Sequence, residues 1–155
     1  MELWDIALRL CAATVLGGAI GLNRDLHGKP TGVRTLGLVA LGSALVVMII
    51  AEAGTGPRGS ADAVSRVVQG IITGIGFLGA GGILHDTEGS RVHGLTTAAC
   101  IWLTAGIGLA CGIGTWQILL VAVPLVLVLL TAGGPIERAI HRRLRKPPDG
   151  GAELP

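Results

Sequence analysis

The chain has 155 residues, of which half are hydrophobic and only 14% are charged, and its formal net charge is +2. A water-soluble domain of this size needs more charge to cover its surface, and a charge this small without a basic, aromatic-interleaved face excludes nucleic acid as a partner. The cysteines stand in apolar runs without a C-x-x-C pair, which indicates buried free thiols. They are Cys11, Cys100 and Cys111.

Long uncharged runs define the fold class. A membrane-spanning helix needs about 20 mainly apolar residues, and the chain offers segments of this kind at 3–22, 34–52, 64–84, 94–113 and 116–133. The sequence predicts an all-α integral membrane protein, a bundle of about five transmembrane helices within residues 1–136. Residues 137–155 are expected to form a basic juxtamembrane segment, which touches anionic lipid headgroups or docks a cytoplasmic partner, and then a disordered cytoplasmic tail.

The distribution of lysine and arginine predicts the orientation. Five spans place the two termini on opposite sides of the membrane, and one side carries only Arg58 and Arg66, with Arg9 just inside the first span. The other side carries Arg24, Lys29, Arg34, Arg91, Arg138, Arg142, Arg143, Arg145 and Lys146. The positive-inside bias therefore predicts an outer N-terminus and a cytoplasmic C-terminus.

The polar residues near the first two loops are candidates for function, since ionisable groups at membrane depth are costly. Arg24 and Arg34 follow the positive-inside rule, and they are also placed to pair with Asp25 or to bind a helix end. Thr35 stands beside Arg34 at the start of the second span.

A second polar group is expected at the start of the third span. Asp62 and Arg66 are one helical turn apart, which fits an N-cap with an ion pair and also fits a functional pair. Asp5, Arg9 and Glu52 are expected at the same level, so that a mixed-charge cluster could form there. Carboxylates suit magnesium, which makes Glu52 and Asp62 the candidate metal ligands, although the arginines oppose a cation. Gln69, one turn deeper, needs a hydrogen-bond partner.

Residues 70–84, GIITGIGFLGAGGIL, contain the G-x-G-x-x-G spacing of a dinucleotide-binding loop. That loop follows a strand and needs an acidic residue about 20 residues later. No acid occurs between Glu88 and Glu137, and both flanks are apolar, which excludes a nucleotide. Glycines at such spacing predict close helix packing, although their density also fits a broken helix lining a cavity. The expected packing glycines are Gly17, Gly21, Gly70, Gly74, Gly76, Gly79 and Gly81.

Thr96 and Thr97, at the start of the fourth span, are expected to cap that helix or to hydrogen-bond between helices. The sequence shows no H-E-x-x-H motif and no Walker-type lysine, so an enzyme is not expected. The full set of candidate polar residues is Arg24, Arg34, Thr35, Asp62, Arg66, Gln69, Thr96 and Thr97.

Three blocks of the chain resemble the MgtC/SapB family of bacterial inner-membrane proteins. They are GGAIGLNRDLHGKPTGVRTLGLVALGSAL, SRVVQGIITGIGFLGAGGIL and GLTTAACIWLTAGIGLACGIG. The resemblance implies a compact bundle of about five helices and an association with growth under magnesium limitation and with survival of pathogens in macrophages. It implies a protein that modulates membrane physiology without enzymatic activity and without transporting magnesium, in some members through the rotary ATP synthase.

The chain departs from the family pattern at Asn23, where the family usually carries Glu, and at Asp62, which is four residues before Arg66 rather than three. Larger members add a soluble cytoplasmic domain, which is not expected in this chain. Two other functions remain open: a small ion or solute channel, and a regulatory subunit that binds another membrane complex. A homo-oligomer is expected because the small-residue faces of the helices offer surface for contact with a second copy. No cofactor is expected other than magnesium.

Overall fold

The computed structural model describes residues 1–53, 60–84 and 94–144. These residues form five helices: α1 Leu3–Leu26, α2 Val33–Ala53, α3 Ser60–Leu84, α4 Leu95–Ile113 and α5 Trp116–Leu144. All five are long and apolar enough to cross a membrane, which confirms the predicted all-α membrane fold. Arg58, Arg91, Arg145, Lys146 and the expected tail from 145 onward lie outside the described residues.

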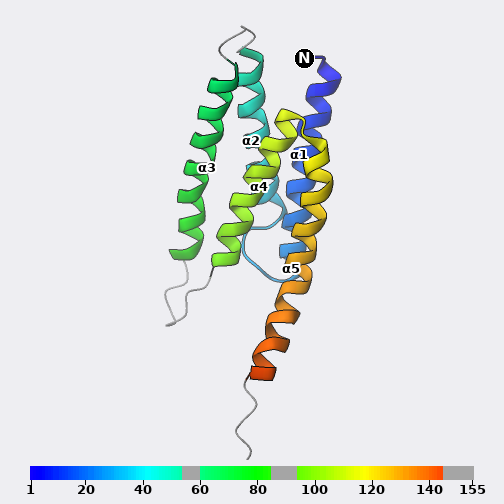
Figure 1. The fold of residues 1–155 in the computed structure, drawn as a ribbon, viewed down its shortest axis with the longest axis vertical. Coiled ribbons are helices and arrows are strands. Elements are labelled where there is room, and N and C mark those ends of the chain that lie inside the picture. The colour runs from blue at the N-terminus through cyan, green and yellow to red at the C-terminus, as the bar shows by residue number, and fades with distance from the viewer. Residues whose placement is uncertain (54–59, 85–93, 145–155) are drawn as a thin grey trace, which may run out of the picture.

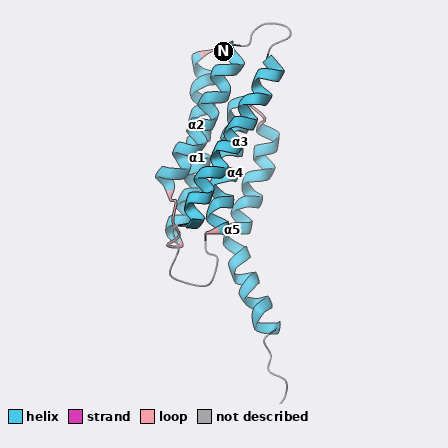
Figure 2. Cartoon of the chain, turned by 90° about the vertical axis from the view of Figure 1, so that its left-hand side faces the viewer, coloured by secondary structure: helices cyan, strands magenta, loops and turns pink. Residues whose placement is uncertain are grey.

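The helices run up and down in sequence order, so the bundle has two ends (Figure 1). Met1, the end of α2, the start of α3 and the end of α4 lie at one of them, which we call the Met1 end. The α1–α2 loop, the end of α3 and the start of α4 lie at the other, the Arg24 end. α5 continues through Pro124 and Pro135 to Leu144, so the segment expected to be merely juxtamembrane begins as helix and extends beyond the other helices (Figure 2).

The central helix is α4, which contacts all four of the others. α1 and α2 pack on each other and on α4, whereas α3 rests on α2 and α4, and α5 rests on α1 and α4. α3 and α5 therefore lie on different sides of the bundle and do not touch within the described residues (Figure 1). The buried apolar core lies between α1, α2, α4 and the inner face of α5, and includes Ile20, Leu36, Ala40, Ile101 and Cys111.

Glycines bring the backbone of α2 against its two main neighbours. A Cβ atom on Gly17 of α1 would lie 2.6 Å from the Leu36 carbonyl oxygen, and one on Gly21 would lie 2.6 Å from the backbone of Val33. On α4, a Cβ on Gly112 would lie 2.7 Å from the Ala44 carbonyl oxygen. Real Cβ contacts are not this short, so only glycine permits these helix separations, and the closeness maximises van der Waals packing.

Arg9 of α1 fastens the C-terminal end of α4. Its Nη1 donates to the carbonyl oxygen of Gly112 over 2.8 Å, and its Nε donates to Asp5 Oδ1 over 3.0 Å. The last carbonyls of a helix have no partner inside the helix, so a guanidinium at this position satisfies one of them. Gly114 follows with φ of +88° and ends the helix in the left-handed conformation.

Replacing Gly108 by alanine is expected to lower the free energy of unfolding by about 1–3 kcal/mol, the usual cost of overpacking. The added Cβ would meet the Ala40 backbone, which cannot rotate aside. Titration with SDS in mixed micelles, followed by helicity, measures the change. Gly106→Ala is the matched control on the same helix, because nothing lies within 4 Å of its added Cβ. Equal losses in both variants would contradict the close contact between α2 and α4.

Candidate functional site

The most unusual group in the bundle is the guanidinium of Arg24, in the last turn of α1. Arg24 is only 3% exposed, although an arginine carries a permanent charge and is seldom buried without an acidic partner. Among the described residues, no carboxylate accepts a hydrogen bond from it. Instead it donates to neutral oxygen and sulfur atoms on two other segments, which makes it the centre of the candidate site.

Two of these acceptors belong to the first turns of α4. Arg24 Nη2 donates to Thr97 Oγ1 over 2.6 Å, and Nη1 lies 3.4 Å from Cys100 Sγ. Both acceptors are buried, so these contacts are shielded from water. The remaining acceptors lie in the α1–α2 loop, where Nε and Nη2 donate to the Pro30 carbonyl oxygen over 3.0 and 2.9 Å.

The α1–α2 loop needs this support. Thr31 has a φ of +62°, in a left-handed region where β-branched residues are outliers and strain costs on the order of 1–3 kcal/mol. Arg24 Nε reaches Thr31 Oγ1 over 3.3 Å. Asp25 accepts from the backbone N–H of Val33 over 3.0 Å, which satisfies a free donor at the start of α2 and places a negative charge at its positive end.

One interpretation of the sequence was an ion pair between Arg24 and Asp25. In the structure the two side chains instead bind different partners. Burying a charge without hydrogen bonds is very costly, and here the neutral acceptors together offset that cost. The arrangement holds no nucleophile beside a general base. Its hydrogen bonds hold the α1–α2 loop against the start of α4.

The other polar residues expected near this end lie on the surface. Arg34, Thr35 and Thr96 are exposed, so of the two adjacent threonines only Thr97 joins the buried cluster. Arg34 and Thr35 line an open surface depression of about 470 Å³ with Leu38 and Val39.

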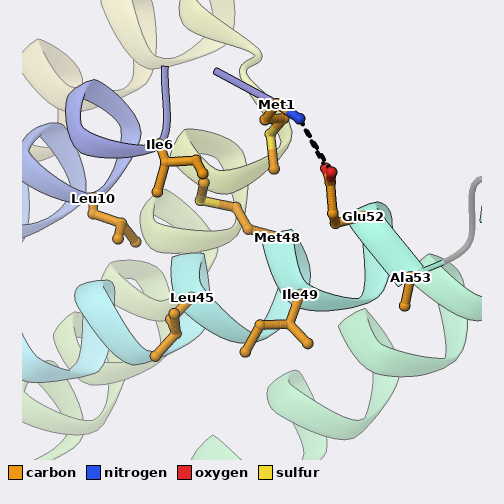
Figure 3. A pocket seen from close by; sticks show the side chains of 8 residues that line it. All are labelled: Met1, Ile6, Leu10, Leu45, Met48, Ile49, Glu52 and Ala53. Carbon is orange, nitrogen blue, oxygen red and sulfur yellow. Dashed lines mark hydrogen bonds and ion pairs between the residues drawn. The ribbon is translucent and has the colours of Figure 1, made fainter. Parts of the chain in front are cut away.

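At the Met1 end, the charged residues that were expected to cluster form two separate ion pairs. Glu52 binds the amino group of Met1 over 3.1 Å (Figure 3), and Asp5 binds Arg9. Glu52 borders an apolar groove of about 460 Å³ between α1 and α2, lined mainly by aliphatic and methionine side chains. Within the described residues, no three Asp, Glu, His or Cys side chains come together. Asp5, Glu52 and Asp62 therefore do not form one carboxylate cluster, and a metal site at Glu52 and Asp62 stays a prediction.

α3 carries the remaining candidates, and it exposes most of them. Asp62, Arg66 and Gln69 are exposed, and the described residues form no ion pair between Asp62 and Arg66. Of the α3 glycines expected to pack, only Gly79 is buried, where an added Cβ would lie 3.3 Å from Ala98 Cβ. An added Cβ would meet nothing within 4 Å at Gly70, Gly74, Gly76 and Gly81. These four glycines therefore pack against no other described helix of this chain, and their expected role in helix contacts stays a prediction.

Sequence reasoning missed Cys100, Pro30 and Thr31 as partners of Arg24. One signal was available for Cys100, since it follows Thr97 by three residues and so shares its helix face. No sequence signal marks the Pro30 carbonyl oxygen, because the direction of a loop carbonyl depends on the folded backbone.

A model of the MgtC family matches residues 10–139. This chain belongs to the MgtC family. The resemblance inferred from the three sequence blocks is thereby confirmed, and the protein is a multi-pass bacterial membrane protein. Arg24, Thr97 and Cys100 all fall within the matched region.

The chain is similar to several curated relatives. Protein SrpB of Synechococcus elongatus is 45% identical over 86% of this chain and 77% of that protein. Protein MgtC of Salmonella paratyphi A is 39% identical over 99% of this chain and 62% of that protein. An uncharacterized protein of Haemophilus influenzae is 35% identical over 89% of this chain and 59% of that protein. The chain thus spans only part of the length of each of these relatives, and no solved structure matches it.

Replacing Thr97 by valine is expected to lower the free energy of unfolding by about 1.5–3 kcal/mol, as for other hydrogen bonds to charged groups. Valine keeps the shape of threonine but leaves an N–H of the buried Arg24 without its acceptor. Thr96→Val is the control, because it makes the same chemical change at the exposed neighbour. SDS titration of both variants measures the difference. Equal stability of the two would show that the bond to Arg24 contributes nothing.

Proposed function

We propose that this chain is a non-enzymatic modulator of membrane physiology under magnesium limitation. Its membership of the MgtC family and its 39% identity to a protein named MgtC support this role. We also propose that it lies in the inner membrane with the N-terminus outside and the C-terminus in the cytoplasm, as the distribution of basic residues indicates.

The observation that carries the proposal is the bonding of the membrane-embedded charges. Arg24 and Arg9 donate hydrogen bonds to acceptors inside the protein. The charged groups on α3 lie on an exposed face. In the described residues, charged side chains therefore do not line an interior path. A protein of this kind acts through contacts within the membrane, with a second copy or with another complex, more readily than through transport.

One observation favours the second candidate, a small ion or solute channel. Thr104 is 0% exposed, and its Oγ1 has no hydrogen-bond partner among the described residues. It lies about two turns after Thr97 on the same face of α4. Buried polar groups are normally paired. An unpaired hydroxyl at this position is therefore available to a water molecule or an ion on a polar path along α4.

Expression of this chain in a bacterium that lacks its MgtC-like protein is expected to restore growth at limiting magnesium. Arg24→Gln is expected to lose most of the effect, because it removes the charge-assisted bonds that hold the loop on α4. Arg34→Gln, an exposed arginine at the same end, serves as the control. Growth rate in defined medium is the measurement. Failure of the chain where full-length MgtC of Salmonella restores growth would refute the proposal.

Liposomes that contain the purified protein and a magnesium-sensitive dye are expected to show the same magnesium influx as empty liposomes. Among the described residues, the embedded Arg9 and Arg24 bond within the protein, so the magnesium gradient is expected to persist. If magnesium influx exceeded that of empty liposomes and Thr104→Val abolished the excess, the result would contradict the modulator function and support the channel function. The same comparison with potassium and proton dyes extends the test to common ions.

A further inference from the structure

α3 distributes its side chains in the opposite way to a helix that faces lipid. Its inner face, which contacts α2 and α4, carries apolar side chains such as Val64, Val68, Ile71 and Ile75. Its exposed face carries polar and small residues at alternating spacings of four and three. They are Asp62, Arg66, Gln69, Thr73, Gly76 and Ala80, which we call the α3 seam, and all of them are exposed.

α5 shows what a lipid-facing helix looks like in the same chain. Its exposed positions include Leu120, Leu125 and Leu129, between 58% and 80% exposed, and these present bulky apolar side chains. Over the membrane-crossing part of α3, the exposed large hydrophobic side chains are Phe77 and Leu78, and the α3 seam contains neither. Hydrocarbon offers no partner to an amide, a guanidinium or a carboxylate. The α3 seam is therefore built to be covered by protein rather than by lipid.

The spacing of the α3 seam identifies the kind of cover. Alternating steps of four and three average 3.5 residues, the repeat that keeps one helix face against another along a left-handed coiled coil. Thr73, Gly76 and Ala80 are small enough to let two backbones approach closely. An added Cβ on Gly70 or Gly74, beside the α3 seam, meets nothing within 4 Å in the single chain, so this space is open to another helix.

The chemistry of the α3 seam is complementary to itself. Asp62 and Arg66 are one turn apart, about 6 Å along the axis, so in a parallel pair each guanidinium can reach the carboxylate of the other chain. The Gln69 amide both donates and accepts, and so it pairs with an identical amide across a two-fold axis. Equal opposite charges and an amide suit a second copy of the same surface, as an isologous contact requires.

We propose that the α3 seam is the contact surface of a parallel homodimer, with a two-fold axis along the membrane normal. This inference deepens the proposed function, because it names the partner of one contact surface as a second copy of this chain. In the dimer, Gln69 makes an amide pair at membrane depth and Asp62 and Arg66 form two symmetric ion pairs. Phe77, which is 86% exposed in the single chain, lies beside the α3 seam and packs at the edge of the contact.

Disulfide cross-linking in native membranes tests the dimer. Cys11 is first replaced by serine, because it is the exposed cysteine of the described residues, and Thr73→Cys is then introduced into the full chain. Mild oxidation with copper phenanthroline is expected to give a covalent dimer. Leu78→Cys on the same helix is also exposed but lies off the α3 seam, and it is expected to remain monomeric. Neither exposed substitution endangers folding.

Two further variants test the chemistry in the Thr73→Cys background. Gln69→Leu is expected to lower the cross-linked fraction by roughly threefold to tenfold, as for loss of one interhelical hydrogen bond. Asp62→Arg is expected to lower it through repulsion, and the double variant Asp62→Arg with Arg66→Asp is expected to restore it. That rescue requires the same surface on both sides of the contact.

A monomer from Thr73→Cys, or an adduct with a different protein, would overturn the homodimer. Equal cross-linking of Thr73→Cys and Leu78→Cys would also overturn it, since it would show random collision. Cross-linking does not depend on magnesium or on growth, so a failed dimer leaves the growth assay to judge the proposed function separately. A confirmed dimer with no growth effect would refute the proposed function alone.

Discussion

The backbone of α2 approaches those of α1 and α4 more closely than any side chain larger than hydrogen permits, and the rest of the bundle depends on this approach. Lipid removes the hydrophobic force that would otherwise drive helices together. Association must then come from close packing and from polar contacts. Gly17, Gly21, Gly108 and Gly112 supply the first, because each meets backbone or Cβ atoms of α2 or of the loop that precedes it.

Polar contacts from α1 complete the core at its two ends. Arg9 binds a free carbonyl at the C-terminal end of α4, and Arg24 binds Thr97 and Cys100 at its N-terminal end. A single helix thus fixes the position of α4 along the bundle axis through two guanidinium groups. Glycine packing alone would resist sliding weakly, whereas hydrogen bonds at separated points define the register. This explains why both arginines point into the protein although the membrane makes their burial costly.

The two outer helices serve different surroundings. α5 presents bulky aliphatic side chains, so its exposed face suits the acyl chains of lipids. α3 buries few of its residues within the chain, 6% over its most apolar stretch against 56% for α4, and its exposed face carries polar and small residues. The polar groups on this exposed face suit another protein surface, such as the second copy in the proposed dimer. The core of the bundle is thus formed by α1, α2 and α4, and α3 and α5 pack on it from different sides.

The sequence alone determined the class of the protein, the number of membrane helices and their approximate limits, because hydropathy and helix length act locally and need no knowledge of neighbours. It also pointed to Arg24 and Thr97, since a polar residue at membrane depth is conspicuous. Tertiary structure alone decided that Thr97 and not Thr96 bonds to Arg24, and that Glu52 pairs with the amino group of Met1. It also decided that Gly70, Gly74, Gly76 and Gly81 of α3 are exposed, whereas Gly79 is buried against α4. These outcomes depend on the rotation of each helix about its own axis, which is set by contacts between helices rather than by the composition of any one of them.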